Sequence, residues 1–176
     1  MKKSLFLILV LSFSLGLKAQ VADSVKANMI ADWERAKLYT KAYLEAMPKD
    51  KYSLRAQDSV RTFAQQMLHL AQGTVMLGSN GINKPMIWQG ANLEQSKTAQ
   101  SADSVMYYAL ASYDYVIEGL KALDVSKFWE KAGRGNFMFT RYAWIEKAFE
   151  HQTHHRGQTT VYIRIAGAKP PQEMLF

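Results

Sequence analysis

Four long stretches of this chain repeat apolar residues at the spacing of an α-helix, and no stretch alternates them as a half-buried β-strand would. The glycine-containing Gly78-Ser-Asn-Gly81 is expected to end the second helix. Helices of this length predict an all-α fold, a four-helix bundle with long connections between helices two and three and between helices three and four. The four stretches cover residues 23–47, 58–77, 99–122 and 140–165.

The first nineteen residues have the composition of a bacterial export signal. Met1-Lys-Lys3 is basic, residues 4–17 are almost entirely apolar, and Ala19 is a small residue at which a signal peptidase would cut. The apolar run is shorter than the roughly 20 residues that a membrane-spanning helix needs. We therefore expect residues 1–19 to be removed, which leaves residues 20–176 as a single periplasmic or secreted domain with no stable membrane anchor.

The composition excludes several kinds of protein. The chain has no cysteine, so it carries neither a disulfide nor the lipid anchor of a lipoprotein. Its net charge of +7 falls to +4 when Lys2, Lys3 and Lys18 leave with the signal. The remaining basic residues are scattered among acidic ones, and this pattern argues against a surface for nucleic acid.

Three of the four histidines lie in one string of the fourth stretch, His151-Gln-Thr-His-His-Arg-Gly-Gln158. His151 and His155 are one helical turn apart on the face that we expect to point inward, whereas His154 lies beside that face and is the least favoured ligand. His69 stands between two leucines on the second stretch and joins the pair only if the two helices pack together. The spacing alone leaves a metal site and a solvated histidine patch equally open.

Four other residues bear on the site, and three of them admit more than one interpretation. Metalloprotease helices with the same histidine spacing carry a glutamate where this chain has Gln152, so a protease mechanism is disfavoured. Gln158 and Tyr162 are weak catalytic candidates, as an orienting group and a proton donor, although helix packing explains both at least as well. Gly73 either leaves space for a bound molecule or permits close helix packing.

The residues that follow the histidines complete a recognisable pattern. After the histidine string come Val161-Tyr-Ile-Arg164, Gly167 and Pro170-Pro171. Together they resemble the C-terminal signature of the DinB family, also described as DinB/YfiT-like metalloenzymes. The resemblance spans about residues 23–172 and is strongest at its C-terminal end.

This resemblance implies a four-helix bundle with a metal site. In the family one histidine of the second helix and the first and last of a His-x-x-x-His on the fourth bind the metal, which on this chain implies His69, His151 and His155 as ligands. Three neutral imidazoles form an open site for a divalent transition metal, with Zn²⁺ or Ni²⁺ expected first and Fe²⁺ next. The family name gives no reason to expect DNA binding.

The implied activity is that of a metal-dependent enzyme acting on a small molecule by thiol transfer or by hydrolysis. Relatives in the family include thiol-dependent transferases, whereas an oxidising exported compartment is poor in free thiols and favours water. A metal-binding or scaffold bundle without catalytic activity is the alternative. The two differ in whether metal-loaded protein turns over a substrate.

The fourth stretch also carries a second apolar sector, on roughly the side opposite the histidines. A bundle helix normally needs only one apolar stripe. The extra sector predicts a homodimer that uses it as a contact, unless the long connections cover it. Its members are Tyr142, Ile145, Phe149 and Ile163.

Overall fold

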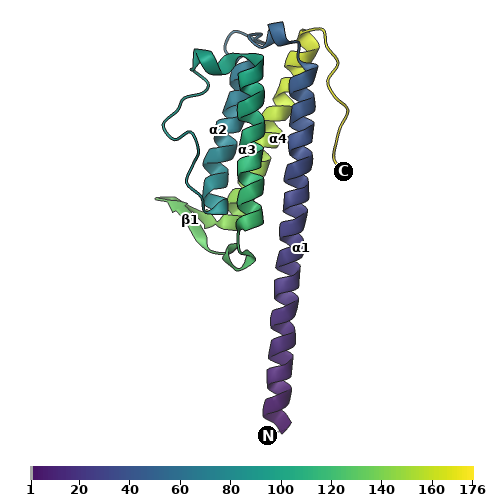
Figure 1. Cartoon of the computed structure of the whole chain (residues 1–176), viewed down its shortest axis with the longest axis vertical. Coiled ribbons are helices and arrows are strands. Elements are labelled where there is room, and N and C mark those ends of the chain that lie inside the picture. The colour runs from purple at the N-terminus through teal and green to yellow at the C-terminus, as the bar shows by residue number, and fades with distance from the viewer. Residues whose placement is uncertain (1) are drawn as a thin grey trace.

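The computed structural model describes the backbone of residues 2–176 and the side chains of residues 20–176. The predicted signal peptide over residues 1–19 therefore lies outside the residues whose side chains are described. The predicted all-α four-helix bundle is confirmed (Figure 1). Its helices are α1 (Lys2–Ala46), α2 (Phe63–Ile82), α3 (Ala102–Ala122) and α4 (Arg141–Ile165).

None of the helices that the structure describes combines the length and the apolar character needed to cross a membrane.

The start of α2 is set by a capping box rather than by the apolar pattern. Thr62 Oγ1 accepts a hydrogen bond from the Gln65 backbone N–H at 3.1 Å, and Gln65 Oε1 accepts one from the Thr62 backbone N–H at 3.0 Å. This reciprocal pair satisfies two N–H groups that a helix start would otherwise leave unpaired. The helix consequently begins at Phe63, five residues after the start that its sequence periodicity indicates.

The prediction that Gly78 and Gly81 end the second helix is wrong, because α2 continues through both to Ile82. A Cβ atom at Gly78 would lie 2.7 Å from Val116 Cγ2 of α3, and one at Gly81 would lie 2.6 Å from Ile145 Cγ1 of α4. Both distances are shorter than any van der Waals contact. The glycines are therefore the positions at which neighbouring helices approach α2 most closely.

The four helices are arranged in two parallel pairs. Gly78 faces Val116 and Gly119 faces Ile82, so α2 and α3 run in the same direction, as do α1 and α4. Adjacent helices from different pairs, including α2 and α4, are antiparallel. Residues 83–101 therefore cross back along the bundle before α3 begins, as the thin loop beside α2 shows in Figure 1. This topology is the reason for the long connection that the sequence indicates.

The core extends along the bundle and is rich in aromatic side chains. Trp33 of α1 contacts Tyr113 of α3 and Phe149 of α4 edge to face, with ring centroids 5.7 and 5.3 Å apart. Such pairs stabilise a core beyond the area that they bury. The largest fully buried side chains are Trp33, Tyr113, Phe63, Phe128, Leu44, Met47, Met67, Leu68, Leu70, Leu120, Ile145 and Ile163.

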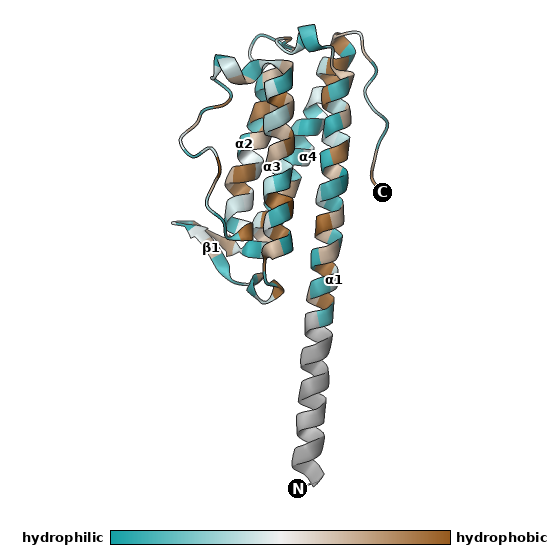
Figure 2. Cartoon of the chain, viewed as in Figure 1, coloured by the Kyte–Doolittle hydropathy of each residue, from teal (hydrophilic) through white to brown (hydrophobic). Residues whose placement is uncertain are grey.

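Helix α4 is more hydrophilic than α2 or α3 (Figure 2), although it packs against both α1 and α2. Some of its buried polar side chains form a network of contacts with side chains of α1 and α3. Gln152 Oε1 accepts hydrogen bonds from Tyr113 Oη at 2.7 Å and from Arg156 Nη1 at 2.9 Å, and the Arg156 guanidinium lies 4.5 Å from the centre of the Tyr39 ring. The Gln152 side chain is therefore buried and hydrogen-bonded within the core.

The second apolar sector of α4 is covered within the subunit. Ile145 and Ile163 are fully buried, and Phe149 packs on Trp33 of α1. Tyr142 stacks on Trp129 of the α3–α4 connection with ring centroids 5.3 Å apart. Most of the sector is thus covered within the subunit, Tyr142 and Phe149 remain half-buried, and the predicted homodimer stays a prediction.

A β-hairpin in the α3–α4 connection departs from the predicted purely helical pattern. Strands β1 (Lys131–Arg134) and β2 (Phe137–Thr140) pair antiparallel, with Gly135 at φ 59° in the turn between them. Trp144 of α4 anchors the hairpin by donating a hydrogen bond from Nε1 to the Ala132 carbonyl at 2.9 Å. Neither strand alternates apolar and polar residues, so the hairpin leaves no strand pattern in the sequence.

Candidate metal centre

Three histidines meet where α2 packs antiparallel against α4. His69 comes from α2, and His151 and His155 come from successive turns of α4. One ring nitrogen from each lies within 4.8 Å of the others. The ring centroids are 4.5 Å apart for His69 and His155, and 4.4 Å apart for His151 and His155. The structure therefore brings together the three residues that the sequence and the family resemblance single out.

Gly73 provides the space that the ring of His151 occupies. A Cβ atom at Gly73 would lie 2.0 Å from His151 Cε1 and 2.5 Å from His151 Nε2. Any larger side chain would displace the imidazole. Close packing against His151 of α4, one of the two interpretations open for Gly73, is observed, and Gly73 also lies in the wall of a cavity beside the histidines.

His69 is oriented by an acidic residue of the α2–α3 connection. His69 Nδ1 lies 2.6 Å from Glu94 Oε1, while Glu94 Oε2 accepts a hydrogen bond from Arg61 Nε at 2.6 Å. Burial alone would raise the pKa of Glu94, but the hydrogen bonds from Arg61 and His69 hold that pKa below its ordinary value. An ionised carboxylate requires Nδ1 to be the protonated nitrogen, which leaves Nε2 of His69 free.

His155 is oriented by glutamines. Its Nδ1 lies 3.1 Å from Gln158 Oε1 and 2.8 Å from Gln66 Nε2, and the two glutamine side chains also contact each other. A protonated Nδ1 donates to Gln158 Oε1 and leaves Nε2 free, whereas an unprotonated Nδ1 accepts from the Gln66 amide. Gln158 therefore contacts the ring of a candidate ligand, as its interpretation as an orienting group requires. His151 differs, because its buried Nδ1 has no hydrogen-bond partner in the described part of the chain.

The remaining candidates lie outside the cluster. The Tyr162 hydroxyl donates to the Arg61 carbonyl at 2.8 Å and its side chain is buried, which matches the packing interpretation. His154 is exposed and is not among the grouped histidines. Glu94 and Gln66 are contacts of the cluster that sequence reasoning missed. Glu94 gave no signal because it lies in a connection without helical periodicity.

Two of the three histidines are neutral at neutral pH. Burial, followed by the neighbouring histidines, lowers the pKa of His151 and of His155 to about 4. A neutral imidazole is the form that binds a metal ion. Three converging imidazoles, two of them with the second nitrogen hydrogen-bonded, form a donor set that fits a divalent transition metal with a position open for a further ligand.

The lowered pKa values predict that metal-free protein loses stability in mild acid. The unfolded chain binds protons on His151 and His155 near pH 6.5, whereas the folded chain binds them only near pH 4. Stability is therefore full above pH 6.5 and falls as the pH decreases toward 4, by up to roughly 3 kcal/mol for the two interacting rings together. Urea unfolding of metal-free protein between pH 7 and 4 measures this loss. His151→Gln should show a shallower decrease, and an equally steep one would contradict the assignment.

Two cavities reach the cluster from different sides, and His151 lines both. One, of about 560 Å³, is bordered by α2, α4 and the hairpin. The other, of about 420 Å³, lies beneath the α2–α3 connection and includes Gln72, Asn92, Glu94 and His69 in its wall. The candidate metal centre is thus accessible to small molecules from both sides.

Comparisons with known proteins agree with this architecture. The sequence profile described as DinB family matches residues 22–174. A crystal structure of a DinB-like protein from Bacillus cereus superposes with a TM-score of 0.69 at 17% identity, covering 82% of this chain and 95% of that one. Another, from Bacillus subtilis, has a TM-score of 0.64 at 18% identity and covers 85% and 96%. Among curated proteins, none matches the chain.

Proposed function

This chain belongs to the DinB family, and from that membership and its histidine cluster we propose that it is an exported, metal-dependent enzyme acting on a small molecule. The ligands are His69, His151 and His155, and the metal is Zn²⁺ or Ni²⁺, with Fe²⁺ as a further option. The observation that carries the proposal is the convergence of three ring nitrogens within 4.8 Å.

The chemistry of the site follows from its open coordination. A divalent metal on three imidazoles supplies a Lewis acid that makes a water or thiol ligand more acidic. Glu94 holds His69 in the orientation and tautomer that such a site needs. Gln66 and Gln158 hold the ring of His155 through its Nδ1. Neutral His151 and His155 keep the site ready for metal at neutral pH.

The two cavities favour group transfer over hydrolysis, whereas the shortage of free thiols in an oxidising compartment favours hydrolysis. Hydrolysis needs room for one substrate and a water molecule, whereas transfer needs room for two molecules beside the same metal. Cavities of about 560 and 420 Å³ meet at His151, and each lies within the usual size range of small-molecule sites. In the proposed transfer the thiol sulfur forms a bond to an electrophilic carbon of the second molecule, while the bond from that carbon to its leaving group breaks. The thiol proton departs with the leaving group.

Elemental analysis of native protein, followed by a substrate screen with the identified ion, tests the proposal. The screen pairs cysteine with 1-chloro-2,4-dinitrobenzene for thiol transfer and uses 4-nitrophenyl acetate for hydrolysis. Stoichiometric metal together with metal-dependent turnover of the first pair supports the transferase, and turnover of the ester alone supports the hydrolase. Bound metal without turnover of either substrate favours the non-catalytic bundle, and protein that takes up no metal refutes the site.

Replacement of Glu94 by glutamine is expected to lower metal affinity about 10- to 100-fold, the usual effect of losing a group that orients a ligand histidine. The amide cannot stabilise the protonated Nδ1 of His69 as the carboxylate does, since it carries no charge. Competition with a chromophoric chelator at pH 7 measures the affinity. Glu118→Gln serves as the control, because Glu118 lies on the exposed surface of α3 and pairs with Lys121. Equal affinities for the two variants would show that Glu94 has no orienting role.

A further inference from the structure

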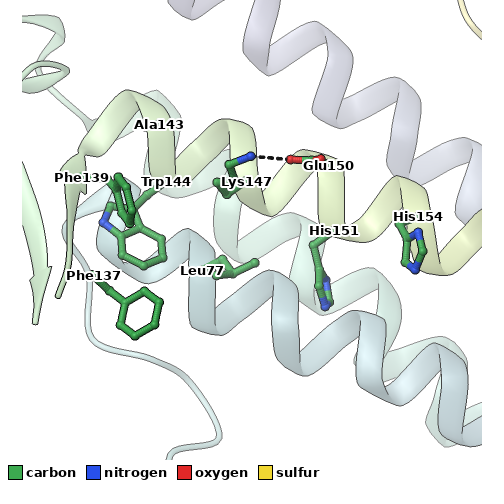
Figure 3. Close-up of a pocket in the computed structure, with 9 residues that line it drawn as sticks. All are labelled: Leu77, Phe137, Phe139, Ala143, Trp144, Lys147, Glu150, His151 and His154. Carbon is green, nitrogen blue, oxygen red and sulfur yellow. Dashed lines mark hydrogen bonds and ion pairs between the residues drawn. The ribbon is translucent and has the colours of Figure 1, made fainter. Parts of the chain in front are cut away.

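The larger cavity beside the candidate metal centre has predominantly apolar walls. Leu77 of α2, Ala143 and Trp144 of α4, and Phe137 and Phe139 of β2 form one part of it. In Figure 3 the three aromatic rings gather at one end of the pocket, and His151 lies toward the other end. The cavity therefore connects an apolar chamber to one of the proposed ligands.

The hairpin keeps large aromatic surfaces exposed at this chamber. Phe137 is 69% exposed and Phe139 is 48% exposed, although both side chains line the cavity. Phe139 contacts the Trp144 ring edge to face with centroids 5.7 Å apart, and Trp144 also anchors β1. Phe139 and Trp144 are thus held in place, and the exposed apolar surface of Phe137 and Phe139 is available to a molecule that enters.

The polar groups around the chamber carry no excess charge. Lys147 and Glu150 pair with each other across 2.7 Å, as the dashed line in Figure 3 shows. His154 is the other polar residue at the rim besides His151. Because Lys147 and Glu150 neutralise each other, neither offers a free charge to a charged ligand. The chamber therefore suits an uncharged group.

We propose that this chamber binds the apolar body of the substrate, an uncharged aromatic ring or branched hydrocarbon, with the reacting group directed toward His151. The volume of about 560 Å³ lies in the range of small-molecule sites. The continuity of the chamber with the histidine cluster favours a small substrate over a second copy of the chain. This inference rests on the proposed function, because it names the substrate class of the same site.

Calorimetric titration of zinc-loaded protein with two hydroxamates tests the inference. Both probes offer the same metal-binding group, but 2-naphthohydroxamate carries a naphthalene ring where acetohydroxamate carries a methyl group. We expect the naphthyl probe to bind at least about 30-fold more tightly, as burial of its apolar surface implies. Phe137→Ser, and Ala143→Phe, which fills the chamber, should reduce that ratio to below about 3-fold.

Met138→Ser is the matched control for Phe137→Ser. Met138 lies between Phe137 and Phe139 on β2, is 43% exposed, and does not line the chamber. Because alternate residues of a strand point to opposite faces, the control removes a comparable apolar side chain from the other face of the hairpin. It should keep the full ratio between the two probes. A ratio near one in the unmodified protein, with both hydroxamates bound, would overturn the chamber while leaving the metal site intact.

Two further measurements separate this inference from the proposed function and from a protein partner. N-phenyl-1-naphthylamine fluorescence with metal-free protein reports the chamber alone, and Phe137→Ser should abolish its enhancement. If that result is obtained but no zinc is bound, the chamber stands and the metal site fails. Sedimentation velocity completes the test. If the unmodified protein sediments as a dimer that the Phe137→Ser substitution dissociates, and fails to bind the fluorescent probe, the hairpin contacts a second copy of the chain. That result would overturn the inference.

Discussion

Alanine at His69, His151 or His155 is expected to lower the affinity for Zn²⁺ or Ni²⁺ by roughly 100-fold or more. Loss of a group that merely orients a ligand already costs about 10- to 100-fold, and removal of the ligand itself leaves only two of three imidazoles. The nitrogens of these three rings lie within 4.8 Å of one another, so no single member is peripheral to the group. Competition with a chromophoric chelator at pH 7, supported by elemental analysis, measures the change.

His154→Ala is the matched control for this series. His154 belongs to the same string and the same helix, but it is exposed and stands outside the grouped histidines. The control should retain metal at the affinity of the unmodified protein. Circular dichroism should show that all four variants remain helical, which separates ligand loss from unfolding. Metal retained by the His69→Ala and His151→Ala variants would refute the ligand assignment.

Gly73→Ala is expected to abolish metal binding while the bundle stays folded. The added methyl group would lie 2.0 Å from His151 Cε1, so the imidazole has to leave its place. His151 lines two cavities into which its ring can swing, and the helices can therefore stay together. The cost of overpacking, typically about 1–3 kcal/mol, is partly offset by the gain of about 1 kcal/mol for alanine over glycine in a helix. We expect at least about a 100-fold loss of metal affinity and at most about 2 kcal/mol of destabilisation.

Gly157→Ala provides the comparison for Gly73→Ala. Gly157 also lies within a helix, but a Cβ atom there would meet nothing within 4 Å. Its substitution should raise stability by up to about 1 kcal/mol and leave metal affinity unchanged. Urea unfolding and the chelator competition, run on both variants, measure the two effects separately. Native metal affinity in Gly73→Ala would mean that the position assigned to the His151 ring is wrong.

The histidine cluster could be predicted because helical periodicity fixes which residues share a face. A spacing of four residues placed His151 and His155 together and His154 to the side, and the structure keeps that division. The partner on another helix was not available from spacing, since nothing in the pattern says which helices pack together. The family resemblance supplied His69, and the antiparallel packing of α2 and α4 brings it to the other two.

The surroundings of the cluster could not be predicted, because they depend on close contacts between segments far apart in the sequence. Glu94 lies 25 residues from His69 in a connection without periodicity, yet its carboxylate orients that ring. Gly78 and Gly81 have the composition of a helix stop, but in α2 they receive side chains of neighbouring helices. In each case tertiary packing, rather than the local preference of the residues, decides the conformation.

The two long connections divide the surroundings of the histidines between them. The α2–α3 connection supplies Glu94 and covers one cavity, and the hairpin supplies Phe137 and Phe139 to the other, whereas the proposed ligands belong to α2 and α4. Substitutions within residues 86–92 or 137–139, which leave Glu94 in place, are therefore expected to alter which molecules enter while keeping the proposed ligands. A library randomised in residues 86–92 would diversify one entrance, and a library in residues 137–139 would diversify the other. The bundle is accordingly a natural scaffold for directed evolution, in which reactivity and selectivity can be varied independently.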